Sequence, residues 1–368
     1  MGEHTLDFHL PEGMMAIDGH IHIDQWSDGK NEGFDSYLGP LEAYREQNGM
    51  AWANVASIPI LGGRDASQNM MAAILKLENP HYFALGGLVH PNLPVTLPVP
   101  EEYGFVQQVE ELIDLGFDGL KMLEGKPNAR RLLGLSFADR AFDAYFSLLE
   151  ERQIHLLWHV NDPANFWDRS SMSQYAIDRG WCYDGPGFLS YEEGYQEVYT
   201  VLRRHPKLKV TFAHLFFLSE QPDRLEELLD SYPNVCVDIT PGSEMYRNMS
   251  TDRKLWREIF TRYADRILLG TDTYTFTPLE TAKDRLETIF RFLLTEDDLT
   301  LYSVPIKGLG LDQETVSRIL SGNFLRRVGA APRKISREKL GAYIQKYLPL
   351  IKNEENRTAV QAYYSQRL

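Results

Sequence analysis

Several features that mark other classes of protein are scarce or missing in this sequence. Only two cysteines occur, Cys182 and Cys236, which is too few for a disulfide framework or a cysteine-based zinc site. We expect two reduced thiols, with one bridge between them as the alternative. No apolar run approaches the roughly 20 residues that a membrane-spanning helix needs. The first residues, MGEHTLDFHLPEGMM, lack a basic stretch followed by an apolar one, so we expect no secretory signal and predict a cytoplasmic protein.

Positive charge is also in short supply. The chain carries 38 Lys and Arg against 52 Asp and Glu, which gives a net charge of −14 at pH 7. A surface of this sign repels nucleic acid and anionic membrane faces, so neither is expected as a partner. The 43% of hydrophobic and 24% of charged residues are typical of a folded globular protein. The expected partner is a small molecule.

Eight short apolar segments recur along the chain, with helical signals between them. They are rich in Val, Ile and Leu with little alternation, as expected for strands that are covered on both faces of a parallel sheet. The segments are 15–23, 51–60, 82–91, 116–123, 154–162, 209–217, 234–242 and 267–276. This alternation predicts an α/β fold, namely a (β/α)₈ TIM barrel. A doubly wound open sheet is the alternative, but GHIHID after the first strand is not the Gly-rich phosphate loop it would require.

Two regions depart from the repeating pattern. The fifth and sixth strands are separated by residues 163–208, whose Trp, Tyr and Gly content predicts a lid-like insertion at the barrel mouth. Beyond residue 330 the chain becomes rich in Lys and Tyr. We therefore predict a barrel over residues 1–330 and a helical extension over 331–368, which packs on the barrel or on the partner in a homodimer.

The first predicted strand carries two histidines near its C-terminal end. His20 and His22 point to the same face because side chains in a strand alternate. Barrel enzymes place their chemistry at this end of the strands, and two imidazoles that converge there suit a divalent metal. The alternative is a pair of hydrogen-bonded core histidines. A single histidine in the strand would favour that interpretation, but two at this spacing favour metal ligation.

Later strands end in further polar residues. Lys121 follows the apolar run of the fourth strand, His159 the fifth, His214 the sixth and Asp272 the eighth. Any one of them could be a satisfied core residue or a helix cap. Together they are difficult to explain by packing, because burying all of them without a cation would be costly.

These segments resemble the amidohydrolase superfamily, and more narrowly its amidohydrolase-related (amidohydrolase 2) branch of metal-dependent TIM-barrel hydrolases and decarboxylases. The segments that carry the resemblance are 18–24, 116–122, 156–163, 210–215, 268–274 and 319–329. The resemblance implies that a divalent metal is held by His20, His22, His159 and Asp272. Zinc is the first expectation and manganese the second. It also implies that Asp272 is the general base on a metal-activated water and that His214 polarises the substrate or moves protons.

The number of metals depends on Lys121. In binuclear relatives a lysine at this place is carbamylated and bridges two metals, and Lys121 and His214 would then join the site. In the amidohydrolase-related branch a similar lysine often does not bridge, and we favour one metal. The sequence continues KMLEGKP, where that branch more often has Lys-Leu-His-Pro. This departure brings Glu124 near the mouth as a ligand, a substrate contact or a salt-bridge partner of Lys126.

Further residues near the mouth are candidates for substrate binding. Arg64 could pair with a substrate carboxylate, although a loop arginine is more often solvated. Aromatic side chains could form a wall for a flat substrate, although aromatics in barrels are more often core. The aromatic candidates are Trp26, Trp52, Trp167 and Tyr274. Asn161 and Asp162 follow His159 closely enough to support that side chain or to cap a helix, and Glu244 is another carboxylate expected at the mouth.

The predicted function is the hydrolysis of a C–N or C–O bond in a small organic molecule, with or without a carboxylate, by a metal-activated water. Non-oxidative decarboxylation at the same metal site is the alternative, because both reactions need the same ligands. A non-catalytic metal-binding protein is a third and weaker interpretation, since such a protein would have no chemical reason to keep costly polar groups at five strand ends.

Overall fold

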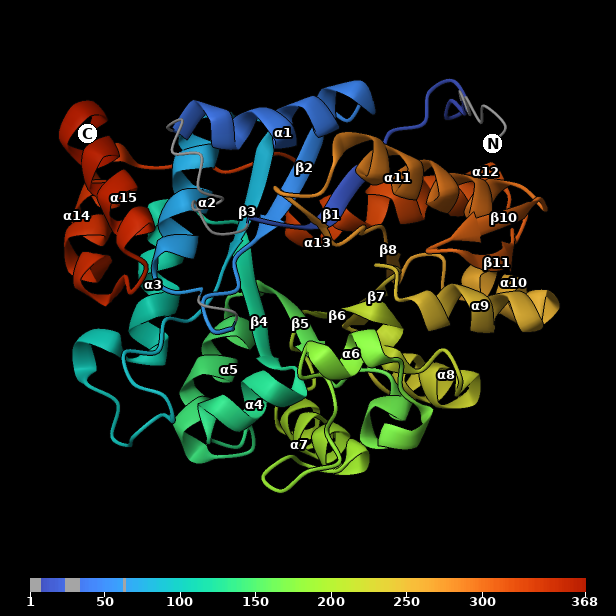
Figure 1. Ribbon diagram of the computed structural model, residues 1–368, viewed down its shortest axis with the longest axis horizontal. Helices are drawn as coiled ribbons and strands as arrows, with labels where there is room; N and C mark the ends of the chain where they lie inside the picture. The colour runs from blue at the N-terminus through green and yellow to red at the C-terminus, as the bar shows by residue number, and fades with distance from the viewer. Residues whose placement is uncertain (1–7, 24–33, 62–63) are drawn as a thin grey trace.

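The computed structural model describes residues 8–23, 34–61 and 64–368 (Figure 1). Within these residues the chain forms a parallel sheet whose strands have the order β8-β7-β6-β5-β4-β3-β2-β1-β9, so that neighbours in sequence are mostly neighbours in space. The strands are β1 (Ile17–His22), β2 (Trp52–Ala56), β3 (Tyr82–Gly86), β4 (Gly119–Gly125), β5 (His155–Val160), β6 (Val210–Phe212), β7 (Val235–Asp238), β8 (Ile267–Leu268) and β9 (Thr273–Tyr274).

The last two strands are parts of one segment that closes the sheet. β8 runs parallel to β7, and β9 runs parallel to β1. Between them, Gly19 N donates to Leu269 O at 3.1 Å and Asp272 N donates to His20 O at 2.9 Å. The segment therefore joins the seventh strand to the first, and the predicted (β/α)₈ TIM barrel is confirmed.

The strands are buried almost throughout, which explains why their sequences show little alternation. At the N-terminal end of the barrel, Phe324 packs against Ile17, Phe83 and Cys236. Trp52 packs on this same cluster. It is the first residue of β2 and lies at the opposite end of the strands from the mouth, so the prediction that it walls the substrate was wrong.

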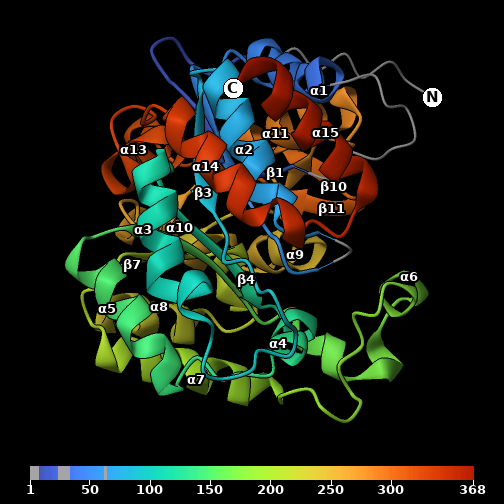
Figure 2. The same cartoon turned by 90° about the vertical axis from the view of Figure 1, so that its left-hand side faces the viewer.

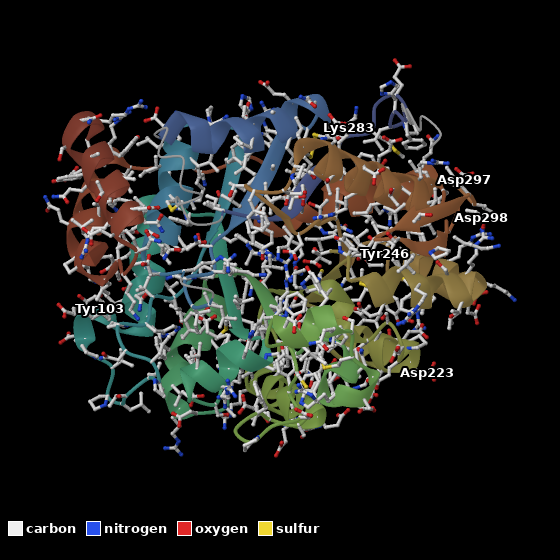
Figure 3. The ribbon with its side chains drawn as sticks, in the orientation of Figure 1. Tyr103, Asp223, Tyr246, Lys283, Asp297 and Asp298 are labelled. Atoms are coloured by element: carbon white, nitrogen blue, oxygen red, sulfur yellow. The ribbon has the colours of Figure 1, made fainter. Side chains whose placement is uncertain are left out.

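Helices surround the barrel in Figure 1. They are α1 (Phe34–Gln47), α2 (Ser67–Glu78), α3 (Phe105–Leu115), α4 (Pro127–Leu133), α5 (Asp143–Glu151), α7 (Tyr191–Arg204), α8 (Pro222–Ser231), α9 (Ser243–Thr251), α10 (Arg253–Arg262), α11 (Leu279–Leu294), α12 (Gln313–Ser317) and α13 (Asn323–Val328). A capping box begins α7: Ser190 Oγ accepts from Glu193 N at 3.3 Å, and Glu193 Oε2 accepts from Ser190 N at 2.8 Å. Charged side chains such as Asp223 and Asp298 lie at the rim of the molecule, whereas Tyr246 lies further inward (Figure 3).

Three additions accompany the barrel. Before α7, the chain carries α6 (Gln174–Asp178), which stands out from the rest of the fold in Figure 2. A two-stranded antiparallel hairpin, β10 (Asp298–Leu301) and β11 (Val304–Lys307), follows α11 and has no counterpart in the sequence prediction. At the end of the chain, α14 (Arg337–Tyr347) and α15 (Glu354–Arg367) pack against α2. The predicted C-terminal helices are therefore present.

Two further features concern the chain as a whole. In the part of the chain that the structure describes, no helix combines the length and apolar character needed to cross a bilayer. Cys182 and Cys236 are both free, in line with the expected reduced thiols.

Candidate metal centre and active site

His20 and His22 converge at the C-terminal end of β1. His20 Nδ1 lies 2.8 Å from Asp238 Oδ2, and His22 Nδ1 lies 2.7 Å from Ala56 O. Because an ionised carboxylate and a carbonyl oxygen only accept, each Nδ1 carries the proton and each Nε2 presents a lone pair. The two Nε2 atoms are 3.1 Å apart. Two lone pairs that face each other at this distance repel unless a cation lies beside them.

Asp272 adds a carboxylate to this pair. Its Oδ1 lies 3.3 Å from His22 Nε2, and the ligand atoms of His20, His22 and Asp272 all lie within 4.8 Å of one another. The two imidazoles are buried, whereas the Asp272 side chain is 33% exposed, which leaves one side of the cluster open to a substrate. Two imidazoles and one carboxylate are a donor set that fits zinc and also accepts manganese.

Burial and neighbouring charges set the ionisation of this cluster. Burial lowers the pKa of His20 to about 3 and also lowers the pKa of His22, so both rings are neutral near pH 7. Burial by itself would raise the pKa of Asp272, but the neighbouring His22, His20 and His214 hold it well below its usual range. His22 Nε2 therefore faces two acceptors, the lone pair of His20 and an ionised carboxylate. The residues present fit a metal cation, and we name His20, His22 and Asp272 the metal cluster, after the ion that they could hold.

Lys121 is the cation that this chain itself brings to the cluster. Its Nζ lies 2.9 Å from His20 Nε2, to which it donates. Burial lowers the pKa of Lys121 to about 8, and the negative charges of Asp238, Asp272 and Glu124 oppose that decrease. The ammonium satisfies the His20 lone pair. It leaves the contact between His22 Nε2 and Asp272 without a donor.

Asp238 connects two of the histidines, and the sequence analysis missed it. One carboxylate oxygen contacts His20 Nδ1, and the other accepts from His214 N at 2.8 Å and from Thr240 N at 3.1 Å. Burial raises its pKa, but His20 and His214 and these hydrogen bonds hold that pKa below the usual range. The available signal was the same as for the other candidates, since Asp238 ends the apolar run VCV of its strand.

His159 and His214 lie together at the ends of β5 and β6, with ring centroids 4.9 Å apart. His159 Nε2 donates to Asn161 O at 3.0 Å and approaches Asp162 Oδ1 at 3.3 Å. His214 Nδ1 donates to Thr240 O at 3.0 Å, and its ring centroid is 5.6 Å from that of His20. Of the four predicted ligands, three come together and His159 lies outside their cluster. Its role as a ligand stays a prediction.

The backbone at the mouth adopts left-handed conformations that non-glycine residues rarely take. Asn161 has φ 62°, His214 has φ 57° and Asp272 has φ 55°. Asn161 and His214 follow β5 and β6, and Asp272 lies between β8 and β9. Each such residue costs roughly 1–2 kcal/mol. Strain of this kind persists where the surrounding structure imposes it, and it gathers at functional sites.

Glu124 and Lys126 do not pair with each other, so that alternative for Glu124 was wrong. Glu124 Oε1 lies 2.9 Å from His90 Nε2, and both side chains are buried. Lys126 Nζ instead donates to Asp162 Oδ1 at 2.7 Å. Asp162 thus links Lys126 to His159, while Glu124 contributes its charge to the surroundings of Lys121.

Two of the predicted substrate contacts lie at the metal cluster. The ring centroid of Tyr274 is 4.9 Å from that of His22, and the Arg64 guanidinium lies 5.5 Å over the Tyr274 ring. Glu244, at the start of α9, is a further carboxylate at the mouth; burial raises its pKa, and the charge of His214 opposes this increase. Trp26, like Asp24 beside it, lies outside the described residues.

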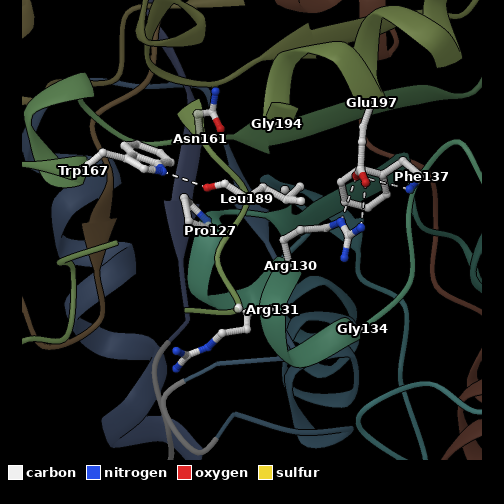
Figure 4. Close-up of a pocket in the computed structure, with 12 residues that line it drawn as sticks. Pro127, Arg130, Arg131, Gly134, Phe137, Asn161, Trp167, Leu189, Gly194 and Glu197 are labelled. Carbon is white, nitrogen blue, oxygen red and sulfur yellow. Dashed lines mark hydrogen bonds and ion pairs between the residues drawn. The ribbon is translucent and has the colours of Figure 1, made fainter. Parts of the chain in front are cut away.

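A cavity of about 240 Å³ adjoins the site without containing the metal cluster. It lies between α4, α7 and the chain before α7. Figure 4 shows Trp167 on one side of it and the ion pair between Arg130 and Glu197 on the other. Trp167 Nε1 donates to Leu189 O at 2.8 Å. Asn161, whose carbonyl oxygen accepts from His159, also lines the cavity. Trp167 therefore belongs to this cavity rather than to the cluster around His20.

The fold of this chain occurs in known proteins of low sequence identity. No curated protein matches the sequence. An uncharacterized TIM-barrel protein from Bordetella bronchiseptica is similar in structure, with a TM-score of 0.52, 13% identity and coverage of 85% of this chain and 98% of the other. A 2,6-dihydroxybenzoate decarboxylase from Rhizobium gives a TM-score of 0.50 and 12% identity, and covers 86% of this chain and 98% of its own.

Identities this low show the fold alone. The sequence match is more specific, because the profile of the family described as Amidohydrolase (amidohydrolase 2) extends over residues 6–326. That range contains every strand of the barrel and the residues of the metal cluster. This chain belongs to the amidohydrolase family.

Proposed function

We propose that this chain is a metal-dependent hydrolase that cleaves a C–N or C–O bond in a small organic molecule, with or without a carboxylate. The observation that carries the proposal is the convergence of His20, His22 and Asp272, whose ligand atoms lie within 4.8 Å of one another. His22 Nε2 faces two acceptors, at 3.1 and 3.3 Å. Such an arrangement is costly without a cation.

Three residues would hold the metal, with His159 as the proposed fourth ligand. Zinc is the first choice for this donor set and manganese the second. When bound, the ion supplies Lewis-acid polarisation of the scissile group and lowers the pKa of a water to about 7. We propose a single ion, with Lys121 beside His20 rather than bridging two ions as a carbamate.

The protein's own groups move the protons and orient the substrate. Asp272 is 33% exposed at the mouth and accepts the proton of the attacking water as general base. His214 presents Nε2 to the site because its Nδ1 donates to Thr240 O. In its protonated form this ring donates to the substrate oxygen or to the leaving group. Arg64, over the Tyr274 ring, pairs with a substrate carboxylate.

Elemental analysis of protein purified without chelator, together with an intact mass, tests the metal site. We expect one metal per chain and no added mass. Two metals with an acid-labile gain of about 44 Da would instead indicate a carbamylated Lys121 and a binuclear site. Protein that takes up neither zinc nor manganese would overturn the proposal.

The reaction is tested with metal-loaded protein against a panel of small amides, lactones and aromatic acids. We expect cleavage of at least one compound, and its loss in Asp272→Ala and His214→Ala. If the whole panel is silent, and these variants keep wild-type metal content and stability, a non-catalytic metal-binding protein becomes the better description.

A non-oxidative decarboxylase is the alternative on the same metal site. The contact between Arg64 and Tyr274 favours it, because a carboxylate held by Arg64 would lie beside His22. One similar structure is named a 2,6-dihydroxybenzoate decarboxylase, and members of this family and its structural neighbours are enzymes. Product analysis separates the two reactions: release of CO₂ without uptake of water indicates the lyase, and two products that incorporate water indicate the hydrolase.

Compartment and assembly are also part of the proposal. Two free thiols, at Cys182 and Cys236, fit a reducing compartment such as the cytoplasm. Light scattering of the purified chain would test the proposed homodimer and the part that residues 331–368 take in it.

A further inference from the structure

The tip of the β10–β11 hairpin has an unusual backbone. Leu301 pairs with Val304, so Tyr302 and Ser303 form a two-residue turn, with φ values of 50° and 64°. Turns of this type normally use Asn-Gly or Asp-Gly, because both central residues need positive φ. Two residues with full side chains cost about 1 kcal/mol each in this conformation. Contacts around the tip must therefore hold it in place.

Those contacts bring the tip to the barrel mouth. At the open end of the hairpin, Lys307 N donates to Ser250 Oγ in the last turn of α9 at 2.9 Å. From this anchor β11 packs against α9, whose first turn carries Glu244, a residue whose charge acts on Tyr302. On the other side, the Arg285 guanidinium lies 5.3 Å over the Tyr302 ring.

Arg285 also ties the tip to the metal cluster. Its Nη1 donates to Thr271 O at 2.9 Å and to Asp272 O at 3.2 Å. One guanidinium thus holds the left-handed backbone at Asp272 and lies over the ring of Tyr302. The phenol lies close to the mouth although it is distant in sequence from β1.

The surroundings of the Tyr302 hydroxyl belong to the mouth. Burial raises its pKa to about 12, and the groups whose charges act on it are Arg285, Asp272, Glu244 and Tyr175 of α6. The hydroxyl is therefore protonated at neutral pH and can donate. The residue as a whole is 45% exposed, so it has room to contact a bound molecule. Tyr175, which is 59% exposed, belongs to the proposed lid-like insertion.

We propose that Tyr302 is a substrate-contacting residue, whose hydroxyl donates a hydrogen bond to a carbonyl or carboxylate oxygen of the substrate at the mouth beside Asp272. The inference rests on the proposed function, since it needs a substrate at this metal cluster. Arg285 acts as a positioning residue for both Tyr302 and Asp272. The barrel thus receives one substrate contact from a hairpin outside its (β/α)₈ framework.

Tyr302→Phe tests the contact, because it removes the hydroxyl and keeps the ring over Arg285. Tyr232→Phe is the matched control, since Tyr232 precedes β7 at the other end of the barrel. On a panel compound that wild type converts, we expect kcat/KM of Tyr302→Phe to fall about tenfold, with unchanged metal content and melting temperature. Tyr232→Phe should match wild type. A Tyr302→Phe variant with wild-type kcat and KM would overturn the proposal.

A second measurement reports contact without turnover. 3-Fluorotyrosine at position 302, and separately at position 232, is observed by ¹⁹F NMR while panel compounds are added to zinc-loaded protein. We expect a compound that binds to shift the resonance at 302 and not the one at 232. A panel without turnover counts against the proposed function, whereas a resonance at 302 that no compound moves counts against the role of Tyr302.

Discussion

At the end of β1 two histidines present Nε2 to a common point, whereas at the ends of β5 and β6 two other histidines engage their surroundings in different ways. We name the first group, His20, His22 and Asp272, the β1 side, and the second, His159 and His214, the β5 side. On the β1 side both Nδ1 atoms donate to acceptors behind the site. On the β5 side His159 uses Nε2 for its own loop.

This difference shows that strand position alone does not determine which ring nitrogen a histidine presents. All four histidines lie at the same end of the barrel, but His20, His22 and His214 are hydrogen-bonded through Nδ1, whereas His159 is hydrogen-bonded through Nε2. Where the acceptor lies behind Nδ1, as with Asp238 and Ala56, Nε2 is available to a metal. His159 would first have to exchange its contacts with Asn161 and Asp162.

The largest effect is expected from His22→Ala, which removes the central ligand of the β1 side. We predict that the protein purifies without metal and that kcat/KM falls by a factor on the order of 10³ or more. The metal content per chain and kcat/KM are measured for the variant and for wild type. His81→Ala is the control, because His81 is exposed just before β3, at the other end of the strands. Wild-type metal content in His22→Ala would refute the cluster.

A smaller effect is expected from His159→Ala, and it tests whether the two sides share one metal. The new contact of His159 with a metal would be partly offset by the loss of its contacts with Asn161 and Asp162. We predict that the dissociation constant for zinc rises about 10- to 100-fold, less than for His22→Ala. Titration against a competing chelator measures both. An unchanged constant would separate the β5 side from the metal site.

Asp238→Asn should weaken the orientation of His20 without removing a ligand. The amide keeps the shape but loses the charge that holds the Nδ1 proton in place. We predict a loss of metal affinity of about tenfold, at the lower end of what such supporting carboxylates contribute. The same chelator titration applies. Equal affinity in the variant and in wild type would mean that Thr240, which lies 3.0 Å from His20 Nδ1, is sufficient.

The smallest effect is expected at the rim of the β1 side. Arg64→Gln should raise KM about tenfold for carboxylated substrates and leave kcat unchanged. KM for uncharged substrates should also stay unchanged, because Arg64 forms an ion pair only with a substrate carboxylate. Arg131→Gln is the matched control, since Arg131 lines the separate cavity and lies over Phe188. A loss that is equal for charged and uncharged substrates would assign Arg64 a structural role.

Much of the fold could be predicted from sequence, because the barrel strands leave a local pattern of apolar residues. Strands covered on both faces must be apolar throughout, so the eight segments are visible without any knowledge of their neighbours. The hairpin after α11 was missed because its four-residue strands are short and lie outside the barrel. Trp52 was misplaced although it stands near the start of the predicted strand 51–60, which is the end opposite the mouth.

The site divides in the same way. The sequence shows polar residues at the C-terminal ends of its apolar segments. This pattern was enough to identify His20, His22 and Asp272 as candidates. Asp238 carries the same signal, yet its contact with His20 spans 218 positions of sequence. Glu124 was paired with the nearest lysine in sequence, whereas its partner is His90 on the neighbouring strand's loop.

The sequence by itself thus determined the barrel, the order of its strands and the end at which chemistry collects, because strand periodicity and burial act through neighbouring residues. The tertiary structure alone decided which ring nitrogen each histidine presents, how Asp238 joins His20 to His214, and that Tyr302 reaches the mouth. These features depend on hydrogen bonds between residues that only the closed barrel brings together, and no local pattern records them.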